Sequence, residues 1–150
     1  MLEHAIRLRG GWERHDPAGA TPPQRASLPF DRWPLDAGKV RLVRHFQRPP
    51  VEAGRETLWL RLDDVPGLVS VALNGLPLHA GPLPESAGLW PLEGLEARNR
   101  LELEVDPAGI SPEGRSAPWG RVALIIRTAV GGPDARVPGG EPLGGSNAEI

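Results

Sequence analysis

Residues 56–75, ETLWLRLDDVPGLVSVALNG, contain two alternating apolar runs separated by turn-forming residues. The apolar positions of the two runs are Leu58, Leu60, Leu62, Val69, Val71 and Leu73. Successive side chains of a β-strand leave opposite faces, so a period of two predicts strands with one buried face. We therefore predict that the two runs are neighbouring strands whose apolar faces share one core.

Two dipeptides in this stretch predict how the strands turn. Asn74-Gly75 readily takes the positive φ angles that a two-residue type I′ hairpin requires, so Leu73 and Leu76 should flank a tight hairpin. Pro66-Gly67 is the pair that a type II turn favours. The first two strands should therefore be joined by a short turn, and the second strand should enter a hairpin.

The same alternation continues away from this stretch. Further strands are predicted near Ala5 to Arg9, from Val40, at Leu101 to Val105 and at Val122 to Arg127, whereas His15 to Pro29 should be a long surface excursion. No segment shows sustained helical periodicity with caps. Short strands at roughly ten-residue spacing, bounded by turn residues, indicate an all-β sandwich or barrel.

Length and composition favour one folded unit. A chain of 150 residues with 39% hydrophobic content can form one core comfortably, whereas two cores would each be marginal. We expect residues 1–128 to form a single β-sandwich domain. Residues 129–150 contain Gly131-Gly132-Pro133, Pro138-Gly139-Gly140 and Gly144-Gly145 with little to bury, which predicts a Gly/Pro-rich, flexible C-terminal tail.

Four of these segments, in this order, resemble the N-terminal sugar-binding domain of family 2 glycoside hydrolases. They are VRHFQRP (43–49), LWLRL (58–62), VSVALNG (69–75) and NRLELEV (99–105). Two departures are Ala97, where the family usually has glycine, and LWPL (89–92), where an aromatic and an aspartate commonly precede a turn. The resemblance covers roughly residues 6–127 and implies a jelly-roll β-sandwich of the galactose-binding-like superfamily. In that family the hydrolytic carboxylates lie on a separate barrel domain, which a chain of this length is expected to lack.

Charge and cysteine content exclude several classes of partner. The 17 basic and 19 acidic residues nearly cancel, so no strong field directs the chain to nucleic acid or to an anionic membrane. Cysteine is absent, which fits a reducing compartment. The first ten residues lack the apolar core of a signal peptide, and no stretch approaches the length of a membrane span. We expect a cytoplasmic protein without nucleic-acid or membrane partners.

Residue types that carry catalysis occur, but without the spacing that catalysis needs. Asp63-Asp64 and the pair Glu102 and Glu104 are expected to be ordinary surface charge, although glycoside hydrolysis does use two carboxyl groups. The four histidines have no metal-ligand spacing, and no serine lies in a nucleophile motif. We predict no enzyme activity and no cofactor. A structural calcium ion stays open, because loop oxygens can bind one without a readable motif.

The tryptophans are the side chains that a ligand could use. An indole ring exposed near a loop offers a flat apolar surface for the C–H face of a sugar, and the candidates for such a site are Trp59, Trp90 and Trp119. The alternative for Trp90 and Trp119, which lie beside turn residues as Trp12 and Trp33 do, is core packing, because tryptophan is usually well buried. Trp59 lies in mid-strand on the face opposite the leucines.

The sequence therefore predicts a non-enzymatic, carbohydrate-binding-like β-sandwich module. The alternative is a protein-interaction or scaffold domain that has lost sugar binding, homo-oligomeric or accessory to a separate enzyme. A protein partner or a second copy of the chain would then take the place of the carbohydrate. The missing export signal favours this alternative, because a polysaccharide binder is ordinarily secreted.

Overall fold

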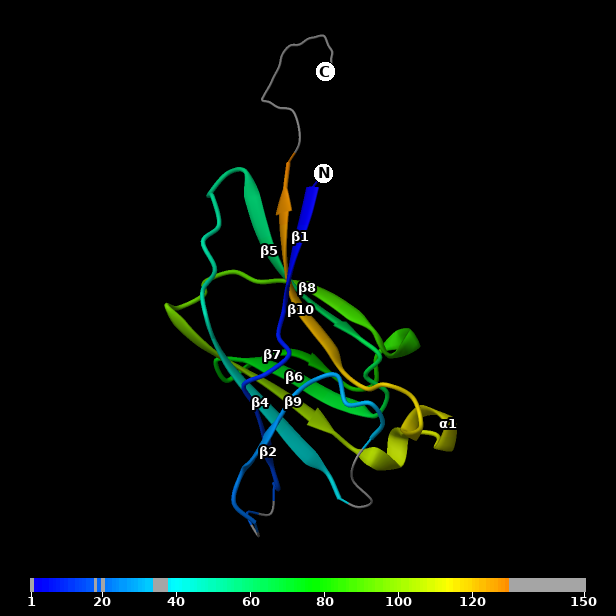
Figure 1. Cartoon of the computed structure of the whole chain (residues 1–150). Helices are drawn as coiled ribbons and strands as arrows, with labels where there is room; N and C mark the ends of the chain where they lie inside the picture. Colours follow the sequence, from blue (N-terminus) through cyan, green and yellow to red (C-terminus); the bar gives the residue numbers. More distant parts are fainter. Residues whose placement is uncertain (1, 18, 20, 34–37, 130–150) are drawn as a thin grey trace.

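The computed structural model describes residues 2–17, 19, 21–33 and 38–129, and this part of the chain forms two antiparallel sheets. Sheet A has the order β1-β10-β5-β8, with β1 (Leu2–Arg7), β10 (Arg121–Thr128), β5 (Glu56–Asp63) and β8 (Gly88–Pro91). Sheet B has the order β3-β2-β4-β9-β6-β7, with β3 (Gln24–Ala26), β2 (Trp12–His15), β4 (Val40–Gln47), β9 (Arg98–Val105), β6 (Leu68–Leu73) and β7 (Leu76–Ala80). The all-β sandwich predicted from the sequence is confirmed, and β1 and β10 run side by side at the top of Figure 1.

The apolar faces of the two sheets pack against each other in one buried cluster. Leu58, Leu60 and Leu62 of β5 are buried from sheet A, as the alternation predicts. Leu101 and Leu103 of β9 belong to the same buried cluster and enter it from sheet B. Alternation in both sheets thus supplies two apolar faces, and burying them together removes both from water.

Both predicted turns are present. Asn74 and Gly75 have φ angles of 52° and 82°, and Leu73 pairs with Leu76 across them, as in a type I′ hairpin. Gly67 has a φ of 79°, and the Leu68 N–H donates to the Val65 carbonyl at 3.3 Å. A side chain at Gly67 would also meet the Asp106 carbonyl oxygen at 2.7 Å, so both φ and space favour glycine there.

The prediction for Val69 is wrong. The pairing of β6 with β9 shifts between Leu68 and Ser70, so Val69 is an extra residue in a β-bulge. The bulge moves Leu68 into the core, with 3% of its surface exposed, and leaves Val69 half-buried. Val71 and Leu73 follow the bulge and keep their predicted inward positions.

Asn99 is the one buried polar residue among the described residues, and both its amide oxygen and its amide nitrogen are hydrogen-bonded. Its Oδ1 accepts from the Asn74 Nδ2 at 3.0 Å and from the Glu96 N–H at 2.9 Å, while its Nδ2 donates to the Glu96 carbonyl at 2.8 Å. The Asn74 Oδ1 in turn accepts from the Arg100 N–H at 2.8 Å. The network ties the β6–β7 hairpin to the loop before β9 and gives the buried Asn99 oxygen and nitrogen the partners that buried polar atoms need.

The first strand and the expected surface excursion differ in part from the sequence predictions. The first strand begins at Leu2, earlier than predicted, and the segment 15–29 is not wholly irregular, because it contains β3. The short helical elements are η1 (Pro84–Ser86), η2 (Pro107–Gly109) and α1 (Pro112–Arg115), and no helix in the described ranges has the length and apolarity needed to cross a membrane. The predicted tail, apart from Ala129, lies outside the described residues.

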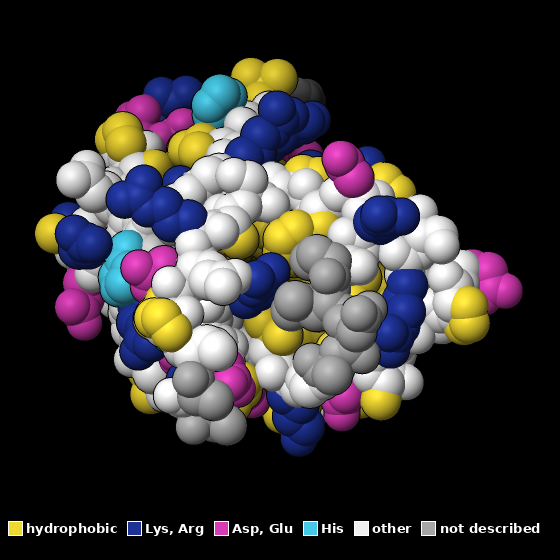
Figure 2. Space-filling model, turned by 60° about the horizontal axis from the view of Figure 1, so that its bottom comes forward, with side chains coloured by type: hydrophobic (Ala, Val, Ile, Leu, Met, Phe, Trp, Pro, Cys, Tyr) yellow, Lys and Arg dark blue, Asp and Glu magenta, His cyan; other side chains and the backbone are white. Residues whose placement is uncertain are grey.

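The end of the molecule that is lowest in Figure 1 comes forward in Figure 2. A group of hydrophobic side chains lies near the centre of this face. Lys and Arg side chains are scattered around this group and interspersed with Asp and Glu. The mixed charge on this face agrees with the near-neutral balance of the sequence.

The bulge predicts a contrast between two adjacent substitutions. Leu68→Ala removes a buried side chain and should lower the free energy of unfolding by about 2–5 kcal/mol. Val69→Ala removes a half-buried side chain and should cost about 1 kcal/mol or less. Urea unfolding followed by tryptophan fluorescence measures both, and a larger cost at Val69 would mean that the regular alternation is correct and the bulge is not.

Candidate functional site

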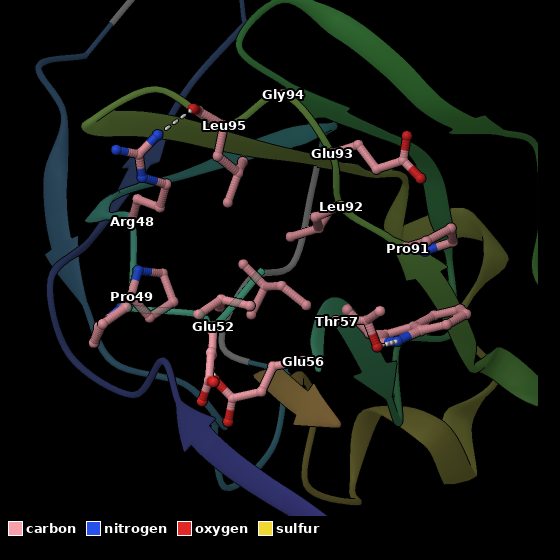
Figure 3. A pocket seen from close by; sticks show the side chains of 14 residues that line it. Arg48, Pro49, Glu52, Glu56, Thr57, Pro91, Leu92, Glu93, Gly94 and Leu95 are labelled. Atoms are coloured by element: carbon pink, nitrogen blue, oxygen red, sulfur yellow. Dashed lines mark hydrogen bonds between the residues drawn. The ribbon is translucent and has the colours of Figure 1, made fainter. Parts of the chain in front are cut away.

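A groove of about 1220 Å³ lies beside the start of β5. We call it the end groove; its lining comes from the β4–β5 loop, from β5 and from the end of β8 with the loop that follows (Figure 3). The lining residues are Arg48, Pro49, Pro50, Val51, Glu52, Glu56, Thr57, Leu58, Trp59, Pro91, Leu92, Glu93, Gly94 and Leu95. An apolar surface with a few polar groups is typical of a small-molecule site.

The core of the sandwich holds the walls of the end groove in place. Leu58 and Leu92 are both core residues, and the Leu92 N–H donates to the Leu58 carbonyl at 2.9 Å. Across the groove, Arg48 donates through its backbone N–H to the Ala97 carbonyl and through Nη1 to the Leu95 carbonyl, both at 3.0 Å. Two loops that are distant in sequence are thus fixed to each other.

Two of the three groove carboxylates are held by local structure. The Glu56 carboxylate accepts from the Glu52 N–H at 2.7 Å and from the Thr128 hydroxyl at 3.1 Å. The hydrogen bond from the Glu52 N–H lowers the pKa of Glu56 below its usual range, and the Thr128 hydroxyl and nearby Arg55 act in the same direction. The Glu52 carboxylate is 3.2 Å from the Arg55 Nη1. Figure 3 shows Glu52 and Glu56 next to each other.

Glu93 lies apart from this pair, on the other side of the groove leucines (Figure 3). Its side chain makes no hydrogen bond or ion pair within the described part of the chain, and it is exposed. With Glu52, Glu56 and Glu93 against Arg48, the lining carries three acidic groups and one basic group. The end groove is therefore an acidic surface around an apolar floor.

Trp59 is the predicted site residue that lines the groove. It lies on the outer face of sheet A, half-buried, and its Nε1 donates to the Thr57 hydroxyl at 3.0 Å. The Arg127 guanidinium lies over the indole, 4.9 Å from the ring centroid, and Glu3 holds that guanidinium at 2.7 Å. One face of the ring is thus covered by Arg127, and the groove borders another part of it.

The other two predicted site residues lie elsewhere. Trp90 pairs with Leu60 and packs against the core, so it projects from the opposite face of sheet A to Trp59, and its ring lies 5.9 Å from that of His79. Trp119 is 0% exposed, and its Nε1 donates to the Pro66 carbonyl at 2.8 Å. Its ring packs against Trp33 with centroids 4.9 Å apart.

The prediction for Trp119 therefore needs a correction, because a wholly buried ring offers no face to a sugar. Core packing, the alternative weighed from the sequence, is what the structure shows for Trp119, and also for Trp12 and Trp33. The three candidate rings do not converge on one site. The predictions that Trp59 and Trp90 contact a ligand stay predictions.

The acidic residues that the sequence analysis considered in pairs form ion pairs with arginines. Asp63 and Asp64 contact Arg61 and Arg121, respectively. Glu102 lies 2.9 Å from Arg100, and Glu104 lies 3.6 Å from Arg41. Within the described residues, no group of three or more His, Asp or Glu side chains could hold a metal ion.

Sequence reasoning missed most of the groove. Pro49 and Leu95 come from loops and Pro91 from the end of β8, and the sequence predicts no site at any of the three. A signal was present, because the segments 48–51 and 91–95 place proline and apolar residues beside a charged residue where a strand gives way to a loop, a position where polar residues are usual. Their convergence depends on the fold and could not be derived from either segment alone.

No family model matches the sequence, and no curated protein is significantly similar to it. Solved structures do match. A β-glycosidase from Bacteroides vulgatus (16% identity, TM-score 0.61) is similar over 87% of this chain and 21% of its own. The GH2 β-galacturonidase from Eisenbergiella tayi (16%, 0.59) is similar over 85% and 25%, and the β-D-glucuronidase from Dictyoglomus thermophilum (15%, 0.59) over 86% and 29%.

The chain has the fold of the N-terminal domain of family 2 glycoside hydrolases. The resemblance inferred from the four sequence segments is thereby confirmed at the level of fold. The chain spans less than a third of the length of these glycosidases, so their activities belong to much longer proteins. At this level of identity the likeness establishes the fold alone.

The hydrogen bonds to Glu56 predict a pH-dependent contribution to stability. Because the pKa of Glu56 is lowered on folding, its stabilisation is present above the unfolded-state pKa of about 4.3 and is lost as the pH falls through the lower folded-state value. Glu56→Gln should therefore be less stable than the wild type at pH 7 and equally stable in acid. Thermal unfolding by circular dichroism at both pH values tests this, and a difference independent of pH would contradict it.

Proposed function

We propose that this chain is a non-catalytic carbohydrate-binding module and that its ligand occupies the end groove. The observation that carries the proposal is the groove itself, which combines an apolar floor, the border of the Trp59 indole and unsatisfied carboxylate oxygens on a glycosidase-associated fold. Sugars present both C–H faces and hydroxyl groups. A surface of this composition can contact both kinds of group.

The apolar contacts would come from rigid side chains. Pro49 and Pro91 have fixed rings, and Trp59 is held by Thr57 and Arg127, so little conformational freedom would be lost on binding. Arg127 covers one face of the indole, which directs the ligand to the groove side of the ring. The groove therefore has a defined apolar wall against which a pyranose could lie.

The polar contacts favour a neutral glycan. Glu93 has free carboxylate oxygens that can accept from sugar hydroxyls, and Arg48, which donates one N–H to the Leu95 carbonyl, has further N–H groups that can donate to sugar oxygens. Glu52 is paired with Arg55, so Glu56 and Glu93 against Arg48 leave an excess of negative charge that would disfavour an anionic sugar. The named neighbours include a glucuronidase and a galacturonidase, which act on uronic acids. We propose a different preference here, for uncharged sugars.

We propose that the end groove is not catalytic, because its carboxylates are not held in the way that glycoside hydrolysis needs. A glycosidase needs one carboxylic acid that can donate a proton and a second carboxylate across the scissile bond. Glu56 has a lowered pKa and both oxygens engaged, which is opposite to what a general acid needs. The acidic residues outside the groove that were considered from the sequence are paired with arginines.

Binding can be tested with a glycan array followed by isothermal titration calorimetry on the best ligand. Trp59→Ala should weaken binding about tenfold or more, because it removes a groove wall. Trp90→Ala is the matched control: it also removes a half-buried indole, but from the inner face of the sheet, and should leave affinity within about twofold. Far-ultraviolet circular dichroism checks that both variants are folded.

A blank array would overturn the proposal. The remaining reading would then be an interaction or scaffold domain on an inherited sandwich fold, including an accessory subunit of a separate enzyme. Equal losses from Trp59→Ala and Trp90→Ala, with both proteins folded, would place the ligand outside the end groove.

The charge of the groove predicts a selectivity. A neutral oligosaccharide should bind more tightly than its uronic acid counterpart, and the difference should shrink at high salt because exposed charges are screened. Glu93→Gln should narrow the difference by removing an exposed negative charge, whereas Glu113→Gln, on α1 and outside the groove lining, should not. Titration calorimetry at low and high salt measures both effects, and tighter binding of the uronic acid would contradict the assignment.

A further inference from the structure

Strand β1 forms one edge of sheet A, and its residues alternate between backbone groups that bond to β10 and backbone groups that face the free edge. The Leu8 N–H donates to the Val122 carbonyl at 2.9 Å, in line with the register of β1 and β10. Hydrogen-bonded pairs alternate in an antiparallel ladder, so the even-numbered residues of β1 bond to β10. The N–H and C=O groups of Glu3, Ala5 and Arg7 therefore point away from β10, toward the edge.

The pairing of β10 with β5, on its other side, leads to the same alternation. The Ala129 N–H donates to the Arg55 carbonyl at 3.0 Å, so the odd-numbered residues of β10 bond to β5 and the even-numbered ones to β1. Among the described residues no strand pairs with the free side of β1. Three consecutive outward residues thus present unpaired backbone groups.

The edge of β1 carries the charged residues Glu3 and Arg7 but lacks several of the other devices that prevent strand pairing. It has no proline or lysine, and its six residues pair with β10 in an unbroken register without a bulge. Leu2, at one end, is 65% exposed. A regular edge of this kind is a template for another strand.

We propose that β1 pairs antiparallel with β1 of a second copy of this chain, with the two-fold axis at Ala5. In this register Ala5 lies opposite Ala5 of the second copy, and Glu3 lies opposite Arg7 of the second copy. All three outward residues are then paired, and each opposite pair can exchange two backbone hydrogen bonds. The two four-stranded A sheets become one continuous sheet.

Charge complementarity selects this register. The side chain of Glu3 contacts Arg127 and Arg61 on the outer face of sheet A, and Arg7 is on the same face because it has the same parity. Opposite side chains in an antiparallel pair lie about 5 Å apart at Cβ, so Glu3 and Arg7 of the second copy attract. Ala5 is small and lets the two backbones approach at the axis.

The alternative symmetric registers are less favourable. A two-fold axis at Glu3 or at Arg7 places like charges opposite each other, which is destabilising. An axis at His4 leaves Arg7 without a partner on β1 and pairs no opposite charges. An axis at Ile6 places Glu3 opposite Arg9, which lies beyond β1 and whose carbonyl already accepts from the Leu28 N–H at 2.7 Å, so that pair cannot exchange two backbone hydrogen bonds. The axis at Ala5 is the one register that satisfies both the backbone and the charges.

The contact is small, so the dimer should be weak and concentration-dependent. Six residues per chain bury much less than the about 800 Å² per partner of a standard interface, and a dissociation constant in the micromolar range or above is expected. Sedimentation velocity on the full chain, from about 1 to about 500 μM, covers that range. A chain that stays monomeric throughout would overturn the proposal.

Substitutions of Ala5, which lies on the proposed two-fold axis, test the backbone pairing of the two β1 strands. Ala5→Pro removes an N–H that points to the free edge and bonds to nothing within the monomer, and proline is tolerated on edge strands. The variant should be folded and monomeric. Ala5→Ser keeps the N–H and the small side chain and should dimerise like the wild type. A dimer that persists in Ala5→Pro uses another surface, which also overturns the proposal.

The charge prediction is tested with two reversals of equal net charge. Arg7→Glu places two glutamates opposite each other and should weaken the dimer about tenfold. Arg9→Glu changes an exposed residue beyond the end of β1 and should have little effect. Equal effects of the two reversals would mean that net charge, and not the β1 register, controls association. Sugar binding is measured separately and does not enter either outcome.

Discussion

The packing of the leucine face of β5 and β10 against β4, β9 and β6 is the interaction on which the rest of the structure depends. Leu60, Leu101 and Leu103 are almost completely buried, and they come from strands far apart in sequence. The same core extends to the end groove, because Leu58 and Leu92 belong both to the core and to the groove lining. Closing the sandwich therefore also sets the shape of the candidate site.

The Asn99 network extends this control to a loop that has little core of its own. Glu96 and Asn74 are tied to the Asn99 amide, and Leu95, just before Glu96, accepts from Arg48 across the groove. The loop before β9 is thus fixed by hydrogen bonds at one end and by Leu92 at the other. A groove with walls fixed in this way is preorganised, which lowers the entropy lost when a ligand binds.

The two proposed surfaces are compatible with each other. The end groove involves β5 and β8, at one side of sheet A, and the proposed dimer uses β1, at the other edge of the same sheet. A dimer would therefore leave both grooves open. Two weak sites held on one particle can bind a repeated glycan more tightly than either site alone, because the second contact becomes intramolecular.

The strands with clear alternation, the Asn74-Gly75 hairpin and the sandwich class could be predicted from the sequence, because alternation and turn chemistry are local properties of the chain. The short strands β2, β3 and β8 were not predicted, because they have too few residues to show a period of two. Only the tertiary structure decided that Val69 is displaced by a bulge, since register depends on the strand opposite. It also decided which tryptophans are accessible. Trp59 and Trp119 are both tryptophans near charged residues in the sequence, yet one borders a groove and the other is enclosed by Phe30, Trp33 and the Pro66 carbonyl. Exposure depends on what the rest of the chain places against a side chain, and that is not encoded in its immediate neighbours.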